Sequence, residues 1–306
     1  MIPRAFWGPS LMVLAMACFA SMDAASKWMI RDHSTAQLMW IRYGFYCFFV
    51  FILVRKQAVG AAMRTRRAWL QGSRALLATV EAAAFVLAFR YLPLADAHAL
   101  GSASPLIVVA LAGWILGEKV GWHRAAAVGA GFAGVLVIIR PGFSELSWPL
   151  LIPLTAAFMW ALYQVMLRMC ARTDHSDTTL LWSSVVGLVA TTIVGPFYWT
   201  PMAAIDWVWM LVISILGAVA HLALTKAMQF GNASALQPYS YTLLIWVAVM
   251  GIVFYGDFPD GWTLLGAAII VASGLYTWHR DRVDPSDAQE QPRLHGSSAH
   301  VVRSSR

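Results

Sequence analysis

Long apolar runs, joined by short polar connections, fill most of this chain. A transmembrane helix needs about 20 mostly apolar residues. Ten stretches of about that length follow one another in the chain: 7–30, 36–54, 69–91, 95–116, 122–140, 148–168, 178–199, 207–229, 233–255 and 261–279. The composition agrees with a membrane protein, because 59% of the residues are hydrophobic and only 12% are charged, whereas an ordinary soluble domain has about 25% charged residues.

A membrane-spanning β-barrel is the alternative architecture, and it requires strands of about ten residues in which apolar and polar positions alternate. The runs 106–116 and 264–275 are apolar on every face and do not alternate. The sequence therefore predicts an all-α integral membrane protein with ten transmembrane helices.

The order of features occurs twice along the chain. Residues 88–118 form a small-residue stretch that ends in Gly117-Glu118, and residues 227–257 end in the similar pair Gly256-Asp257. If each copy contains five spans, the second copy enters the membrane from the opposite side, an arrangement typical of secondary transporters. We expect a first five-helix repeat over residues 1–140, an inverted second repeat over 141–280, and a disordered cytoplasmic tail over the polar residues 281–306.

Lysine and arginine are retained on the cytoplasmic side of short membrane loops. With ten spans and a cytoplasmic N-terminus, sixteen of these residues fall in cytoplasmic segments, and only Arg31 and Arg140 fall on the opposite side. We therefore expect both termini in the cytoplasm of a bacterium and the chain in its inner membrane. This topology accounts for the formal charge of +7, so nucleic acid is not an expected partner.

Charged side chains at membrane depth are costly and usually face a cavity, a partner or the interface. Asp23 and Lys27 lie one helical turn apart and can pair with each other. Together with Arg42 they suggest a charged cluster near the outer mouth, or else an ion pair that holds the first two helices together. Glu81 is the deepest carboxyl group and can contact the substrate or carry a proton; the alternative is a paired structural group.

Other candidate site residues lie in the later spans and carry polar or aromatic side chains: His98, Ser102, Tyr163, His221, Tyr239 and Tyr241. The aromatic members can stack on a planar or cationic ligand, although such residues also gather at membrane interfaces. Pro105 and Pro238 occupy corresponding helices of the two halves. Paired helix interruptions of this kind indicate a binding site between repeats, but a simple kink would also place prolines there.

Several motifs resemble the EamA-type branch of the drug/metabolite transporter superfamily. They are Ser21-Met-Asp-Ala-Ala-Ser-Lys27, Trp40-Ile-Arg42, Tyr91-Leu-Pro-Leu-Ala-Asp-Ala97, Ala103-Ser-Pro105, Gly117-Glu118 and Ala235-Leu-Gln-Pro-Tyr239. The resemblance implies ten helices in two inverted repeats and a cavity lined by helices one, three, four, six, eight and nine. It also implies a subgroup that contains uptake carriers for S-adenosylmethionine and riboflavin and exporters of opine-type metallophores.

These observations together predict a secondary transporter of a small polar or zwitterionic metabolite, whose partners are that substrate, the lipid bilayer and, as a candidate, a coupling proton. Acidic and basic groups occur together in the spans, and this favours a ligand that bears both charges. We slightly favour export of an amino-acid-derived metabolite such as an opine-type metallophore over uptake of riboflavin or S-adenosylmethionine, although nothing in the sequence decides the direction. An integral membrane enzyme is a remote alternative, because no metal-ligand spacing, carboxylate pair or phosphate-binding loop is visible. We expect neither a metal nor another cofactor.

Overall fold

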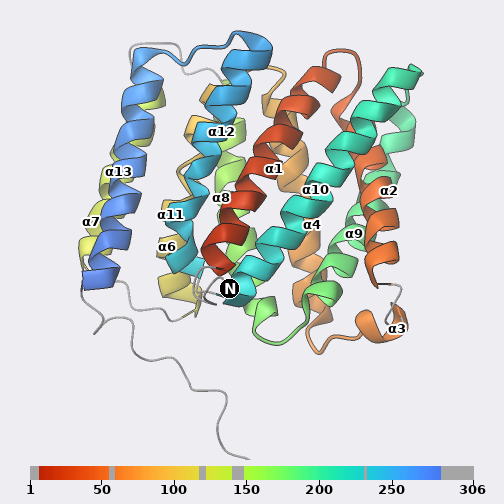
Figure 1. Cartoon of the computed structure of the whole chain (residues 1–306), viewed down its shortest axis with the longest axis horizontal. Helices are drawn as coiled ribbons and strands as arrows, with labels where there is room; N and C mark the ends of the chain where they lie inside the picture. Colours follow the sequence, from red (N-terminus) through yellow and green to blue (C-terminus); the bar gives the residue numbers. More distant parts are fainter. Residues whose placement is uncertain (1–6, 55–58, 117–121, 140–147, 231–232, 284–306) are drawn as a thin grey trace, which may run out of the picture.

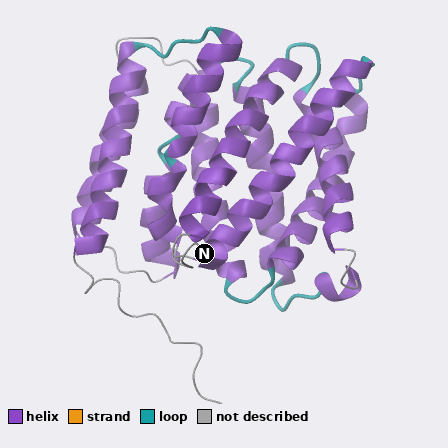
Figure 2. Ribbon diagram, viewed as in Figure 1, coloured by secondary structure: helices purple, strands orange, loops and turns teal. Residues whose placement is uncertain are grey.

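The computed structural model describes residues 7–54, 59–116, 122–139, 148–230 and 233–283. Within these residues the chain is helical and contains no strand (Figure 2), as the apolar runs predict. The part of the predicted tail after residue 283 lies outside the described residues, as do Gly117, Glu118 and Arg140 of the sequence argument.

The helices of the first half follow the predicted spans closely. They are α1 (Trp7–Met29), α2 (Thr35–Val54), the short α3 (Val59–Ala62), α4 (Ala68–Ala88), α5 (Leu94–Gly101), α6 (Ser104–Leu116) and α7 (Trp122–Ile139). The second half contains η2 (Trp148–Leu150), α8 (Leu151–Ala171), α9 (Ser176–Val194), η3 (Gly195–Tyr198), α10 (Ala204–Phe230), α11 (Ala233–Ser240), α12 (Thr242–Met250), η4 (Gly251–Tyr255) and α13 (Gly261–Val283).

Seven helical stretches of the described residues are long and apolar enough to cross a membrane: α1, α2, α4, α5 with α6, η2 with α8, α9 with η3, and α10. Shorter apolar stretches occur within α7, α12 with η4, and α13. The chain is therefore a multi-pass membrane protein.

Two of the predicted spans are broken near their middle. The run 95–116 divides into α5 and α6, with the break at Ser102 and Ala103, just before Pro105. The run 233–255 divides at Tyr241, three residues after Pro238. It then ends in the π-helix η4 and in Gly256, whose φ of 65° is left-handed. π-Helical turns are rare and occur frequently at functional sites.

Packing between the two halves follows a reciprocal pattern. Helix α1 packs on α10 and α12, and in the same way α8 packs on α4 and α6. Corresponding spans of the two halves also meet: α2 contacts α9, α7 contacts α13, and the broken spans contact each other through α6 with α11 and α5 with α12. In Figure 1, α7 and α13 form one edge of the molecule, α2 and α9 lie toward the other edge, and α1 and α10 lie between these two pairs. Exchanging the halves leaves this set of contacts unchanged.

The edge pair α7–α13 is held by a close approach of two backbones. A Cβ atom built on Gly134 would lie 2.8 Å from the Gly266 carbonyl oxygen, and one built on Gly266 would lie 2.6 Å from the Gly134 carbonyl oxygen. Small residues at membrane helix interfaces allow such contact, and dispersion forces then stabilise the pair. Neither position has room for a side chain.

Replacing Gly134 with valine is expected to destabilise the fold by about 1–3 kcal/mol, because extra bulk must displace α13. Valine at Gly129 in the same helix is the matched control, since a Cβ there meets no atom within 4 Å and both changes alter the helix propensity in the same way. Thermal unfolding of the detergent-solubilised variants, followed by size-exclusion chromatography, measures the difference. Equal melting temperatures for the two variants would contradict this packing.

Candidate functional site

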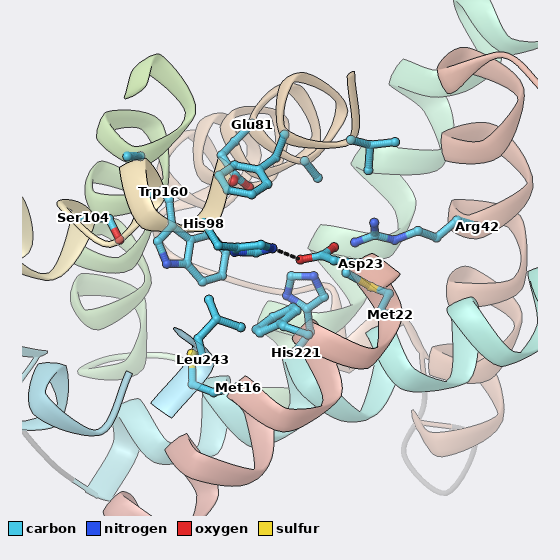
Figure 3. Close-up of a pocket in the computed structure, with 16 residues that line it drawn as sticks. Met16, Met22, Asp23, Arg42, Glu81, His98, Ser104, Trp160, His221 and Leu243 are labelled. Carbon is cyan, nitrogen blue, oxygen red and sulfur yellow. Dashed lines mark ion pairs between the residues drawn. The ribbon is translucent and has the colours of Figure 1, made fainter. Parts of the chain in front are cut away.

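A cavity lies between the two halves of the molecule, and helices of both halves line it (Figure 3). Its charged and imidazole side chains are Asp23, Arg42, Glu81, His98 and His221. The remaining lining is mostly apolar or aromatic: Met16, Phe19, Met22, Ala82, Phe85, Val86, Gly101, Ser104, Ala157, Trp160 and Leu243. A mostly apolar lining with a few converging polar groups is typical of small-molecule sites.

Asp23 and His98 form the one ion pair among the cavity residues that the structure describes. The His98 Nε2 atom lies 3.3 Å from Asp23 Oδ2, so the contact is ionic when the imidazole is protonated. The imidazole packs between the rings of Phe85 and Phe89, with centroid distances of 4.8 and 5.6 Å. These two rings therefore fix the imidazole in front of the Asp23 carboxylate.

Arg42 and Glu81 are buried in the cavity wall without a polar partner. They are 6% and 7% exposed, yet neither forms a hydrogen bond or an ion pair with any residue that the structure describes. In Figure 3 the Arg42 guanidinium extends toward Asp23 from the side opposite to His98. Both side chains line the cavity, so their charged groups are available to a ligand that binds there.

Aromatic rings form one side of the cavity. Phe19 meets Trp160 edge to face at 5.5 Å and His221 at 5.1 Å. Aromatic faces attract cations and stack on planar rings. The lining thus combines charges of both signs with a surface suited to a flat or cationic ligand.

Contacts join α1 to the C-terminal end of η4 and to the loop after it, and we call this end of the molecule the closed end. The Lys27 Nζ atom lies 2.7 Å from Asp257 Oδ2, and Tyr255 donates a hydrogen bond to the Ala24 carbonyl oxygen. The Tyr255 ring also lies 4.9 Å from Lys27 Nζ and 5.5 Å from the Arg31 guanidinium. The expected pair between Asp23 and Lys27 is absent from this structure, because Asp23 contacts His98 on α5 and Lys27 contacts Asp257 in the loop after η4.

A second polar cluster joins the halves at the same end. The two nitrogens of His33 contact Thr200 Oγ1 at 3.0 Å and Asp206 Oδ2 at 3.2 Å. Gln37 exchanges hydrogen bonds with the Thr200 backbone in both directions, at 2.8 and 3.0 Å. The connection after α1 is therefore fastened to the connection before α10.

At the opposite end, Arg74 is a fully buried charge in the second turn of α4. Its Nη2 atom donates to Gln71 Oε1, to the Thr179 carbonyl oxygen and to Ser183 Oγ at 2.9–3.0 Å. Gln71 in turn donates to Asp174 Oδ2 at 2.7 Å. In the charge count along the sequence, Arg74 is one of the sixteen residues placed in cytoplasmic segments. The structure shows that its side chain does not lie in a loop but joins α4 to α9 inside the bundle.

Five of the residues singled out in the sequence are not part of the cavity lining. Lys27 belongs to the closed end. Ser102 donates to the Ala99 carbonyl oxygen at the break after α5. Tyr163 packs behind Trp160, with a centroid distance of 5.1 Å. Tyr241 lies in a separate core beside Gly274, and Tyr239 is partly buried against the main core.

The structure also places residues in the cavity that the sequence did not single out as site residues. Trp160, Phe19, Phe85 and Ser104 line it. Trp160 precedes Tyr163 by three residues on α8, so helical periodicity puts both on one side of the helix, but periodicity does not say which of the two reaches the cavity. The Pro238 side chain lies outside the described part of the chain, and so nothing follows for its role. Among the described residues no cluster of histidine, cysteine, aspartate and glutamate is suited to a metal ion.

Comparison with known proteins identifies the family. The sequence profile of the EamA-like transporter family matches residues 6–140 and again residues 146–277. The chain belongs to the EamA-like transporter family. It is therefore a membrane transporter and not an enzyme, and its small-molecule cargo crosses a lipid bilayer.

Several EamA-like relatives have been assigned a cargo. The chain is 30% identical to a riboflavin transporter of Rhizobium johnstonii, with 89% of this chain and 91% of the relative covered. It is 24% identical to an S-adenosylmethionine uptake transporter of Rickettsia prowazekii, covering 75% and 78%. It is also 24% identical to the pseudopaline exporter CntI of Pseudomonas aeruginosa, covering 87% and 94%. The relatives thus differ in cargo and in direction.

One protein of known crystal structure has the same fold. It aligns with a TM-score of 0.65 at 18% identity, over 91% of this chain and 98% of the other. This likeness bears on the fold alone.

Replacing Arg74 with alanine is expected to destabilise this EamA-like protein by about 2 kcal/mol or more, because hydrogen bonds to a charged group each contribute about 1.5–3 kcal/mol. The same change at Arg66, which is exposed, is the control and should leave stability within about 0.5 kcal/mol. Thermal unfolding in detergent measures both variants. A melting temperature of the Arg74 variant equal to that of the control would mean that the buried network adds no stability.

Proposed function

We propose that the protein is a secondary carrier that moves a zwitterionic metabolite across the bacterial inner membrane by alternating access. The proposal includes ten transmembrane helices in two inverted five-helix repeats, residues 1–140 and 141–280, with both termini in the cytoplasm. The reciprocal helix contacts and the two family matches support this arrangement. The bias of lysine and arginine toward one side supports the orientation, in which the closed end at Lys27 and Asp257 faces outward.

The observation that carries the substrate class is the unpaired guanidinium of Arg42 in the same cavity as the Asp23 carboxylate. An anionic group of the ligand would pair with Arg42. A cationic group would pair with the Asp23 oxygen that does not contact His98. A ligand with only one charge would leave one of these groups without a partner in a poorly solvated site, and this costs free energy. A dipolar ligand is therefore the best match.

The named relatives fit this substrate class in part. S-adenosylmethionine, named for the relative from Rickettsia prowazekii, carries a carboxylate, an ammonium group, a sulfonium group and a planar adenine ring. Its charges match Arg42 and Asp23, and its ring matches the aromatic side formed by Phe19 and Trp160. S-adenosylmethionine is therefore the first probe, and amino-acid-derived metallophores belong to the same chemical class.

Riboflavin is the second candidate substrate, and the aromatic side of the cavity favours it. A large flat ring system would stack on the rings near Trp160 and gain apolar burial. The relative from Rhizobium johnstonii is named a riboflavin transporter. Riboflavin has no charge to place beside Arg42, so it ranks below a zwitterion on the charges of the cavity.

Direction depends on the gradient that drives the carrier, and the relatives include both uptake and export. Export, which the sequence argument favoured, and uptake are the two arms of one experiment. Metabolites of cells and medium are compared between a deletion strain, the wild type and an overexpressing strain. Accumulation of a zwitterion inside the deletion strain means export, whereas its depletion from the medium only when the protein is present means uptake.

Purified protein in liposomes is expected to exchange radiolabelled S-adenosylmethionine against an internal unlabelled pool. Arg42→Gln should lower this exchange about tenfold or more, because one charge-assisted hydrogen bond is lost. The exposed Arg66→Gln is the control and should behave as the wild type. Exchange of riboflavin without exchange of S-adenosylmethionine would favour the second candidate, and exchange of neither by correctly inserted protein would refute both substrates.

We further propose that Glu81 carries a coupling proton, since its buried carboxyl group has no polar partner among the described residues. Glu81→Gln should abolish accumulation driven by a pH gradient while leaving exchange within about threefold of the wild type, because exchange moves no net proton. Glu81→Asp keeps an ionisable group and is the matched control. Unchanged gradient-driven accumulation in Glu81→Gln would remove Glu81 from the coupling mechanism.

A further inference from the structure

Asp23 and Lys27 lie one turn apart on α1, and each has a partner on another element. Asp23 pairs with His98 on α5 inside the cavity, and Lys27 pairs with Asp257 at the closed end. Residues four apart on a helix face the same way and are close enough to pair. Lys27 therefore has two carboxylates within reach of its flexible stem: Asp257 across the gap between the halves, and Asp23 on its own helix.

The contact of Lys27 with Asp257 is also the connection that closes the outer end. It joins residues 230 positions apart, and both side chains are partly accessible, at 13% and 28% exposure. Opening this end requires α1 and η4 to separate, which would leave Lys27 without Asp257. A lysine left unpaired in this region would be costly, so the open state requires another partner for it.

Asp257 lies in the loop that directly follows η4, and the geometry of this segment allows a change of register. The π-helix η4 ends at Gly256 in a left-handed conformation, with φ of 65° and free space around the position where a Cβ would be. The Asp257 amide donates to the Gly251 carbonyl oxygen, across the π-helical turn, at 3.1 Å. Converting a π turn to an α turn changes the register by one residue, and this would shift Asp257 relative to α1.

We propose that Lys27 exchanges partners during transport: it holds Asp257 while the outer end is closed and pairs with Asp23 while that end is open. The exchange keeps the lysine neutralised in both states, so that neither state is strongly disfavoured. It also defines two discrete arrangements of one element, which is what a switch requires.

The exchange also connects the closed end to the contents of the cavity, a step that rests on the proposed function. A cationic group of the substrate that binds Asp23 competes with Lys27 for this carboxylate. Lys27 then returns to Asp257 and the outer end closes over the loaded cavity. An empty cavity leaves Asp23 available and permits opening, so a ligand shifts the two states through its different affinity for them.

A substrate-free experiment tests the exchange. Ser104, which lines the cavity, is replaced by cysteine in a chain whose native Cys18, Cys47 and Cys170 are replaced by serine. The rate at which a membrane-impermeant thiol reagent labels this cysteine from the Lys27 side reports how much of the protein is open outward. Lys27→Gln and Asp257→Asn are then compared in this background.

The exchange predicts an asymmetry between the two variants. Asp257→Asn removes a partner only from the closed state, so labelling should rise about fivefold or more. Lys27→Gln removes the pair from both states, so labelling should change less than about twofold. A simple latch predicts the reverse, since Lys27→Gln loses the ion pair and also the contact with the Tyr255 ring, 4.9 Å away. Lys27→Arg keeps both pairings and should label as the wild type does, and this checks that position 27 tolerates substitution.

A double variant tests the role of Asp23 directly. Asp23→Asn combined with Asp257→Asn should lose most of the rise, because the open state no longer has its own ion pair. Labelling of Lys27→Gln equal to or above that of Asp257→Asn, or an unchanged rise in the double variant, would overturn the exchange.

Adding S-adenosylmethionine to the wild-type background tests the link to the substrate separately. Slower labelling supports competition at Asp23. The expected asymmetry without any effect of S-adenosylmethionine would keep the exchange and refute the competition by this substrate.

Discussion

The cost of placing charge at membrane depth is the constraint on which this structure depends. Each charged group of the spans must find a partner, reach the interface or face a cavity. Asp23 and Arg74 have partners on other helices, and Lys27 has one in the loop after η4, so these contacts join parts of the chain that are far apart in the sequence. Arg42 and Glu81 line the cavity and form no hydrogen bond or ion pair with any residue that the structure describes, so they are available to a ligand.

Hydropathy and charge predicted the helices well, because a span of apolar residues between loops allows almost no other structure in a membrane. The same argument could not predict the partners of the charges. The i, i+4 spacing of Asp23 and Lys27 indicates that they can pair, but in this structure a contact between residues 230 positions apart prevails. Such contacts depend on how the halves meet, which no local pattern contains.

The burial of Arg74 could not be predicted for a related reason. It follows a basic segment at the start of α4, and a charge near a helix end usually belongs to the interface. Arg74 is buried because the Thr179 carbonyl oxygen and Ser183 Oγ of α9 lie within hydrogen-bond distance of its guanidinium. Trp160 and Tyr163 show the corresponding limit for aromatic residues, because both are on α8 and only Trp160 borders the cavity.

The edge pair α7–α13 has a consequence for how the sequence can change in evolution. Among the side chains that the structure describes, neither helix contributes a lining residue to the cavity. Their outward side chains, among them Phe132, Leu136 and Leu264, are largely exposed and apolar, while their mutual contact is set by glycines. Substitutions on these outward faces can follow the thickness and lipid content of a bilayer without altering the charges around the ligand. The residues that contact the membrane at this edge and the residues that contact the ligand thus lie on different helices.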